Sequence, residues 1–262
     1  MAAAARPSLR RVGRAAEREL RHYRRSWVAS VFSLFAAPLL FLVTLGYGLE
    51  GLVEEPESFG GLSYLEFVAP GLLVGAPVLA AGNSGLWPIM AGHRWLGFHH
   101  AMVASPIRPA EVALGWLVWV GGRALVQATV LLIVASALGA IGSIRAVAAL
   151  PLAVVTAVAF TAPLMAFTAR QDSDRWFDPI SRVGIAPLYL FSGLFFAVES
   201  LPLLLRVVVA IFPLWHAVEL SRWLAAGLAP AWSPLLHLAV VLAWLIAGGR
   251  AAQQAFAWRL RS

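Results

Sequence analysis

Long stretches without a charged side chain dominate this chain and limit what it can fold into. A helix needs about 20 apolar residues to cross the hydrocarbon core of a bilayer. Five stretches reach that length, between Arg25 and Glu50, Glu66 and His93, Arg123 and Arg145, Arg145 and Arg170, and Arg222 and Arg250. Hydrophobic residues fill 60% of the 262 positions and charged residues only 13%, about half the charge of a typical soluble domain. The sequence therefore predicts an integral membrane protein with five secure spans.

A sixth span is predicted in the shorter apolar run 183–198, which Arg182 and Glu199 bound. Pro213 interrupts the apolar segment that follows, so we expect short re-entrant or outer helices at about 200–228. The fold class is thus an all-α membrane protein with one six-span domain over 28–250. The predicted spans are about 28–49, 65–88, 112–139, 147–169, 183–199 and 232–250.

Arginine residues are concentrated on one side of these spans. Eight lie within the first 25 residues, and most of the others fall in 93–108, in 170–182 and at the C-terminal end. Because loops that remain in the cytoplasm carry an excess of basic residues, both termini should be cytoplasmic, including the tail 251–262. The Ala-rich composition, with Arg as its basic residue throughout, suggests a high-GC bacterial source. The expected location is the bacterial inner (cytoplasmic) membrane.

Residues 1–27 are predicted to form a cytoplasmic interfacial helix. Leu9, Val12, Ala16, Leu20 and Tyr23 recur at spacings of three and four, and arginine residues occupy the positions between them. This pattern places an apolar face in the headgroup layer. The formal charge of +7 is therefore expected to meet membrane lipid, and no nucleic acid partner is expected.

Two missing residue types exclude several kinds of chemistry. All 20 basic residues are Arg, so the Gly-Lys-Ser/Thr end of a phosphate-binding loop cannot occur in this chain. Cysteine is also absent, which excludes thiolate nucleophiles and Cys-based zinc sites. We expect no catalytic residue, no metal and no cofactor bound by this chain itself.

Four sequence segments carry a family resemblance. They are SYLEFVAPGLL, ASPIRPAEVALG, LYLFSGLFFAVESLP and FPLWHAVELSRWLAAG, in chain order. The chain resembles the type-2 ABC exporter permeases, and within them the branch of nodulation lipo-oligosaccharide exporters and daunorubicin-resistance permeases. The resemblance implies a second permease subunit, as a homodimer or heterodimer. It also implies two separate ABC ATPase subunits, which would hold the ATP and Mg that drive transport.

The resemblance further implies a short coupling helix between the second and third spans, at about 91–103. The side chains that would meet an ATPase groove there are His93, Arg94, Trp95, His99 and His100. The alternative interpretation is a headgroup-level loop with basic and aromatic anchors. A zinc site of the three histidines is disfavoured because no Cys or nearby carboxylate completes it.

Polar and aromatic side chains also gather near the predicted outer ends of the spans. Candidates for the substrate path or outer gate are Glu66, Tyr189, Phe195, Phe196, Glu199, Phe212 and Trp215. His216, Glu219 and Arg222 form a second group that we expect to hold the outer helices together. Solvated carboxylates and an ordinary aromatic belt would explain the first group equally well.

Within the third predicted span, Arg123 is a charged residue that needs a partner or access to the surface. It either extends to the cytoplasmic surface or faces the dimer interior, with Gln127 one turn away.

The function expected from the resemblance is ATP-driven export of an amphiphile, either a glycolipid or lipo-oligosaccharide or a hydrophobic drug. One alternative is a rhomboid-like intramembrane serine protease, because Gly82-Asn83-Ser84-Gly85 has the GxSG pattern and His237 is an available base. The predicted topology places Ser84 and His237 toward opposite sides of the membrane. A proton-driven secondary transporter would show acidic residues at mid-membrane and two related halves, and neither is visible in the sequence.

Overall fold

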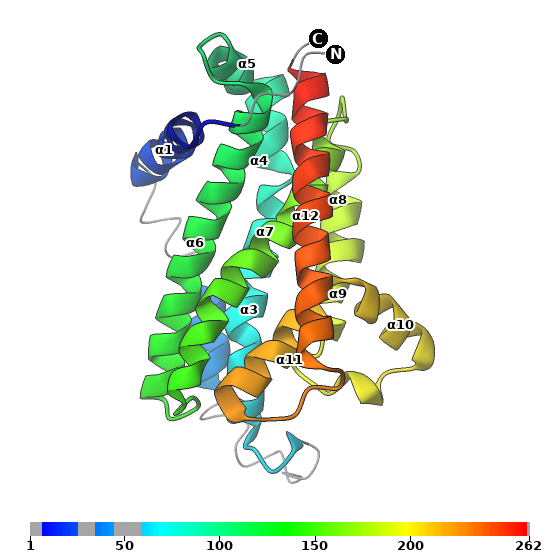
Figure 1. The fold of residues 1–262 in the computed structure, drawn as a ribbon. Helices are drawn as coiled ribbons and strands as arrows, with labels where there is room; N and C mark the ends of the chain where they lie inside the picture. The colour runs from blue at the N-terminus through cyan, green and yellow to red at the C-terminus, as the bar shows by residue number, and fades with distance from the viewer. Residues whose placement is uncertain (1–6, 26–34, 45–58, 261–262) are drawn as a thin grey trace.

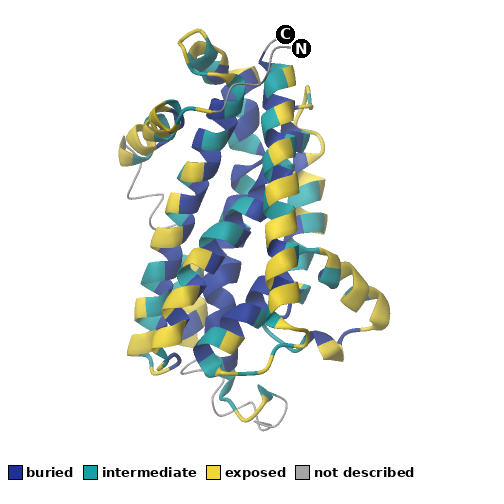
Figure 2. Cartoon of the chain, viewed as in Figure 1, coloured by how far each residue is buried: buried dark blue, intermediate teal, exposed yellow. Residues whose placement is uncertain are grey.

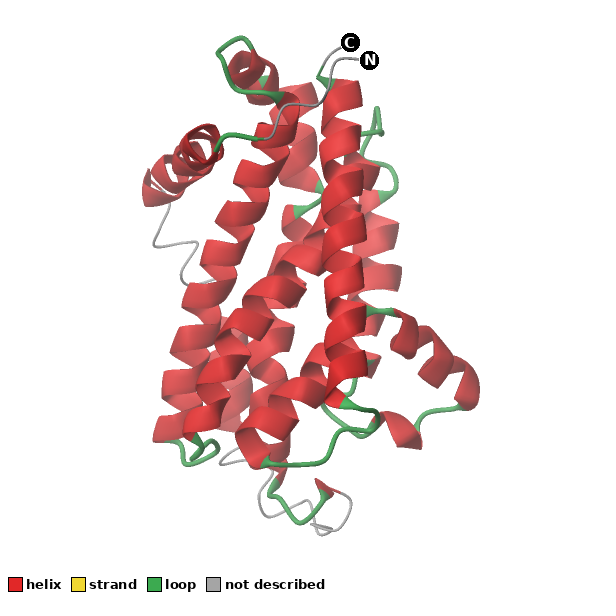
Figure 3. Ribbon diagram, in the orientation of Figure 1, coloured by secondary structure: helices red, strands yellow, loops and turns green. Residues whose placement is uncertain are grey.

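The computed structural model describes residues 7–25, 35–44 and 59–260 of the chain. Throughout these ranges the regular structure is helical, and no strand occurs in them (Figure 3). This part of the fold-class prediction is confirmed. The predicted count of six spans and the position of the N-terminal helix in the headgroup layer stay predictions.

Four long apolar helices of the described chain can cross a membrane. The first is the helical segment Tyr64–Trp95, made of α3 (Tyr64–Ser84), α4 (Trp87–Met90) and the π-helical turn η2 (Ala91–Trp95). The others are α6 (Pro109–Ala137), the segment of η3 (Ile144–Ala148) with α7 (Ala149–Thr168), and α12 (Pro234–Arg259). They overlap the predicted spans 65–88, 112–139, 147–169 and 232–250, and α12 continues nine residues past the predicted end at 250.

The structure describes one of the other two predicted spans only in part and gives the second one different bounds. Of 28–49 the structure describes only the apolar helix Phe35–Thr44, and the remainder lies outside the described residues. In place of 183–199, a helical segment begins earlier, with α8 (Phe177–Pro179), η4 (Ile180–Ile185) and α9 (Ala186–Phe191). It ends at Phe191 because the chain turns at Gly193, which has a φ of +80°, a conformation that favours glycine.

The segment after α9 folds into short helices with a sharp bend. The turn η5 (Val198–Ser200) leads to α10 (Leu203–Ile211) and α11 (Pro213–Ala226), which meet at an angle of 88°. Pro213 causes the bend, since the residue before a proline is disfavoured in helical conformation and Phe212 is accordingly extended. The pair can be a re-entrant hairpin or one broken span, which would make five spans in the described chain.

The helices form one elongated bundle in which α3 and α7 are central (Figure 1, Figure 2). Helix α7 packs against α3, α6 and α12. Small residues allow the close approach, because a Cβ at Gly248 of α12 would lie 2.8 Å from Pro163 Cδ of α7. Buried side chains line the inside of the bundle, and exposed apolar ones cover the outer faces of α6 and α12, as a surface in contact with lipid requires.

The two ends of the bundle carry different elements. One end, called the α5 end, carries α5 (Phe98–Val103) and the last turns of α12, with α1 (Leu9–Arg25) lying across α6 nearby (Figure 1). The opposite end, called the α11 end, carries η3, α10 and α11. The predicted coupling residues lie at the α5 end and the predicted outer helices at the α11 end.

Candidate functional site

The segment 91–103 at the α5 end folds as two short helices rather than as one. Turn η2 continues α4 as far as Trp95, and α5 begins at Phe98. Gly97 between them has a φ of +67°, which glycine adopts without steric cost and other residues rarely adopt. The predicted coupling helix is therefore a helix, a reversal of the chain and a second helix.

His99 docks α5 onto η2 and α12. Its ring is 1% exposed, stacks with the ring of His93 at 6.3 Å and contacts Phe256 of α12 at 5.3 Å between centroids. A Cβ at Gly92 would collide with this imidazole, so glycine is required there. Burial lowers the pKa of His99 to about 3, so the ring is neutral near neutral pH.

The other side chains of this segment point outward. Trp95 is 52% exposed and Leu96 is 74% exposed, and Arg94 and His100 are exposed as well. We call these four residues, Arg94, Trp95, Leu96 and His100, the exposed knob. Of the five predicted interface residues, Arg94, Trp95 and His100 are thus available to a partner, whereas His93 and His99 are buried. The sequence analysis did not include Leu96 in the predicted interface, although Leu96 directly follows Trp95 and lies between Gly92 and Gly97.

Glu111 ties α1 to the beginning of α6. Its carboxylate is fully buried and accepts hydrogen bonds from the backbone N–H of Ser8 at 2.8 Å, from Arg11 Nε at 2.9 Å and from the backbone N–H of Arg108 at 2.9 Å. A carboxylate in the first turn of a helix is also stabilised by the helix dipole. The sequence analysis missed Glu111, although the Arg-Pro-x-Glu pattern within ASPIRPAEVALG is typical of a helix start.

Two further contacts fix α1 over the same region. The Arg18 guanidinium lies 3.4 Å above the ring centroid of Phe98 in α5. Where α1 crosses α6, a Cβ at Gly115 would lie 2.5 Å from Ala15 Cβ. Helices α1, α5 and α6 therefore form one packed unit beneath the exposed knob.

At the α11 end, the FSG segment inserts into a notch of α3. Ser192 donates a hydrogen bond to the Leu188 carbonyl at the end of α9, and the turn at Gly193 follows. The fully buried Leu194 then occupies the space that Gly71 and Gly75 leave on α3, where a Cβ at Gly75 would collide with it. The two glycines of α3 thus receive the turn.

Arg222 of α11 holds this turn in place. Its guanidinium is 4% exposed and donates to the carbonyls of Phe67 at 3.0 Å and Leu194 at 3.1 Å, and also to that of Gly193. It lies 3.6 Å from the centroid of the Phe67 ring and 3.7 Å from the Glu219 carboxylate. Glu219 and Arg222, two members of the predicted outer-helix network, are thus within ion-pair distance of each other.

His216 belongs to a separate network with His237 of α12. Their Nδ1 atoms are 2.8 Å apart, His237 Nε2 is 3.2 Å from the backbone N of Trp232, and His216 Nε2 is 2.9 Å from the Ala210 carbonyl. Because the Trp232 N–H must donate, the assigned order is Trp232 to His237, His237 to His216 and His216 to Ala210. The rings of Trp215 and Trp232 pack around the pair.

The predicted gate residues are distributed over several small clusters. Glu66 accepts a hydrogen bond from the backbone N–H of Ser63 and so caps α3, whereas Glu199 lines a cavity of about 220 Å³ with Glu219 and Arg222. The aromatic members form ring pairs: Tyr189 with Phe195, Phe196 with Phe191, Phe212 with Trp244 and Trp215 with Trp232. Among the described residues, no ring contact joins these four pairs to one another.

The arrangement of Ser84 and His237 does not fit a protease dyad. Ser84 Oγ donates to the Ala80 carbonyl at 3.0 Å and lies 3.4 Å from Arg123 Nη1. Both ring nitrogens of His237 are engaged with other groups, as described above. The glycines of the GxSG pattern serve helix packing, since a Cβ at Gly85 would lie 2.9 Å from Leu164 Cβ.

Comparison with known proteins identifies the family. The ABC-2 type transporter family matches residues 11–225. Nodulation protein J of Rhizobium leguminosarum bv. trifolii is 28% identical over 205 residues, which cover 78% of this chain and 77% of that protein. Nodulation protein J of R. leguminosarum bv. viciae is 26% identical over 86% of this chain and 85% of that protein. Nodulation protein J of Rhizobium meliloti (strain 1021) is 28% identical over 80% of this chain and 78% of that protein.

These matches confirm the resemblance read from the four sequence segments. The family match takes in most of α1, the whole coupling segment and all of α11 except its last residue. With four long apolar helices and a family match over most of its length, the chain is a multi-pass transport subunit and belongs to the ABC-2 type transporter family.

Proposed function

We propose that the chain is the membrane-spanning permease of an ATP-driven exporter and that the exposed knob is where an ABC ATPase docks. The observation that carries this proposal is a large apolar pair, Trp95 and Leu96, held outside the bundle between the polar side chains Arg94 and His100. Exposed aromatic and arginine side chains are the usual anchors of a protein interface. A protruding helical element suits a groove on a partner.

The contacts beneath the exposed knob would transmit a displacement of α5 to the helices of the bundle. His99 links α5 to Phe256 of α12, η2 continues directly from α3 and α4, and Glu111 ties α1 to α6. Packed elements move as units rather than deforming continuously. A displacement of α5 driven by the ATPase would therefore tilt α3, α6 and α12 together.

The remaining parts of the assembly follow from the family. Two ATPase subunits would each hold ATP and Mg, and two permease chains, identical or related, would enclose the path. The chain would lie in a bacterial inner membrane with six spans, both termini cytoplasmic and α10 and α11 at the outer side. The arginine distribution supports this orientation, and the substrate would be a glycolipid, a lipo-oligosaccharide or a hydrophobic drug.

A paired tryptophan substitution tests the docking surface. Trp95→Ala should reduce ATPase co-purification from native membranes by about tenfold or more, since a central aromatic anchor contributes 2 kcal/mol or more to an interface. Trp223→Ala, at an exposed tryptophan of α11, is the matched control and should leave co-purification unchanged. Equal retention of the ATPase by both variants would contradict docking at the knob, and absence of any ATPase with the native chain would contradict the exporter.

A further inference from the structure

Two cavities adjoin between α1 and α6 near the α5 end, and they differ in character. One, of about 460 Å³, has polar residues in its wall, including Arg18, Glu19, His22 and Ser84. The other, of about 540 Å³, is a mainly apolar groove whose wall includes Ala16, Leu20, Val118 and Val126, and Glu17, the carboxylate in its lining, is paired with Arg21. Both share three residues, Tyr23, Trp119 and Arg123. A polar cavity and an apolar groove that meet at one arginine suit an amphiphile, with its headgroup in the cavity and its acyl chain in the groove.

Among the residues that the structure describes, none pairs with the charge of Arg123. Its guanidinium carbon lies 5.9 Å from the ring centroids of Tyr23 and Trp119, and its closest polar contact is the 3.4 Å approach to Ser84 Oγ. Its Nε atom is buried without a hydrogen bond, and no carboxylate among the described residues pairs with it. The buried Glu19 in the same cavity is already paired with Arg18. An arginine in such surroundings is stabilised by an anion.

The apolar groove has room for a hydrocarbon chain. Gly13 of α1 and Gly122 of α6 line it, and a Cβ at either position would have no atom within 4 Å. Leu20 and Val126 are both exposed, so the groove opens toward the lipid. Its position near the α5 end corresponds to the predicted cytoplasmic half of the bilayer.

We propose that this double cavity binds one amphiphile with an anionic headgroup, the anion on Arg123 between Tyr23 and Trp119 and one acyl chain in the groove. The aromatic rings provide the flat apolar surfaces that cover sugar or glycerol carbons of a headgroup. As a loading site for export the inference rests on the proposed function. As a lipid-binding site it depends only on the cavities and on Arg123.

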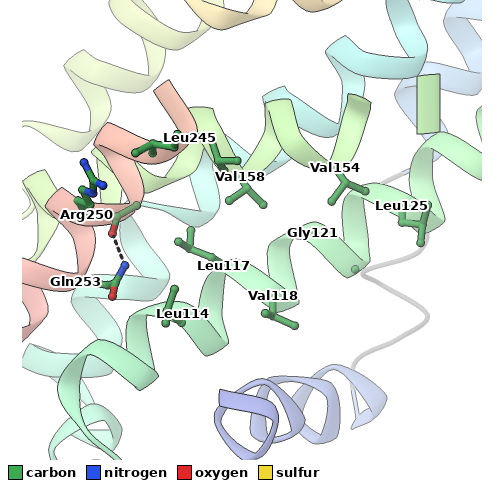
Figure 4. Close-up of a pocket in the computed structure, with 13 residues that line it drawn as sticks. Leu114, Leu117, Val118, Gly121, Leu125, Val154, Val158, Leu245, Arg250 and Gln253 are labelled. Atoms are coloured by element: carbon green, nitrogen blue, oxygen red, sulfur yellow. Dashed lines mark hydrogen bonds between the residues drawn. The ribbon is translucent and has the colours of Figure 1, made fainter. Parts of the chain in front are cut away.

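A larger groove on the other side of α6 provides the comparison. It measures about 730 Å³ between α6, α7 and α12 and is lined mainly by apolar side chains (Figure 4). Figure 4 shows the Arg250 guanidinium directed away from Leu117 and Val118, and Gln253 donates back to the Gly249 carbonyl at 3.1 Å. Arg250 is the charged side chain in this lining, and because its guanidinium is directed away from the apolar wall, the groove should not distinguish an anionic lipid from a neutral one.

Photolabelling with two lipid probes tests the site. The full chain is purified in dodecyl maltoside, which contains no phosphate, and is irradiated with phosphatidylglycerol carrying a diazirine on its acyl chain. Diacylglycerol with the same chain is the neutral probe. We expect phosphatidylglycerol to label peptides within 13–23 and 118–126 about tenfold more strongly than diacylglycerol does, because a charge-assisted contact is worth that factor or more.

Matched arginine variants separate the charge effect from misfolding. Arg123→Gln should remove the preference for phosphatidylglycerol, Arg123→Lys should restore most of it, and Arg250→Gln should leave it unchanged. An unchanged preference in Arg123→Gln would overturn the proposal, as would labelling confined to 245–253. Displacement of the probe by soluble glycerol phosphate with no labelling of the groove would reduce the site to one for free anions and would also overturn it.

The same preparation distinguishes this inference from the proposed function. If no ATPase co-purifies but the Arg123-dependent labelling persists, the exporter proposal fails and the lipid site stands. If the ATPase docks on the exposed knob but the preference for phosphatidylglycerol does not depend on Arg123, the exporter proposal is supported and the lipid-site proposal is overturned.

Discussion

Replacing Arg222 by Met should destabilise the α11 end far more than any other single loss of charge there. The Gly193 and Leu194 carbonyls accept from Arg222, and no other donor in the described chain reaches them. Each buried carbonyl left without a donor costs about 1–3 kcal/mol, which gives about 2–6 kcal/mol for the pair. Removing a buried charge offsets part of this loss, so the expected net destabilisation is about 2–4 kcal/mol.

Unfolding in mixed micelles can measure the difference. The chain contains 11 tryptophans, whose fluorescence reports unfolding as the mole fraction of dodecyl sulfate rises. Glu219→Gln is the matched control because its ion pair with Arg222 is long, at 3.7 Å, and a glutamine oxygen can still accept from the Ala231 N–H. Its expected effect is below about 1 kcal/mol. If Arg222→Met and Glu219→Gln unfold at the same dodecyl sulfate fraction, Arg222 does not hold the turn.

Two further predictions concern the α5 end. His99 is neutral in the folded chain and has an ordinary pKa of 6.5 when unfolded, so acid should favour the unfolded state once the pH falls below 6.5. The loss in the free energy of unfolding should reach about 2 kcal/mol at pH 5. His99→Gln should abolish this part of the pH dependence, and His100→Gln, at an exposed position, should not. Thermal unfolding at several pH values measures the difference. Gly115→Leu should detach α1 from α6 and speed tryptic cleavage at the arginines of α1. The control is Gly249→Leu, at a position where an added Cβ has no atom within 4 Å, and it should not change the cleavage rate. Equal cleavage of the two variants would contradict the packing of α1 through Gly115.

The long helices could be predicted because their signal is local. A run of 20 uncharged residues suffices to predict a span, so α3, α6, α7 and α12 needed no knowledge of their neighbours. The bounds of the helical segment before the FSG turn and the break within 91–103 were harder to predict from the sequence. Both depend on a single glycine, Gly193 or Gly97, whose positive φ overrides the apolar character of the flanking residues.

The polar contacts could be predicted only where both partners lie close in the sequence. Glu219 and Arg222 are three residues apart on one helix, and their pairing followed from helix geometry. His216 was assigned to the same group by its proximity in sequence, but its partner His237 lies 21 residues away on another helix. The contact of Glu111 with Ser8 joins residues 103 positions apart, and no local pattern reveals such a distant pair.

The unbroken length of α12 has a mechanical consequence. Its 26 residues extend about 39 Å, longer than the roughly 30 Å hydrocarbon core. Near one end the Phe256 ring contacts His99, and near the other end His237 is hydrogen-bonded to His216. His237 and Phe256 are about 28 Å apart along the helix axis. Helix α12 packs closely on α7 at Gly248, between these two contacts. If α12 moves as a rigid body about that point, a displacement of its Phe256 end should move His237 and His216 in the opposite direction.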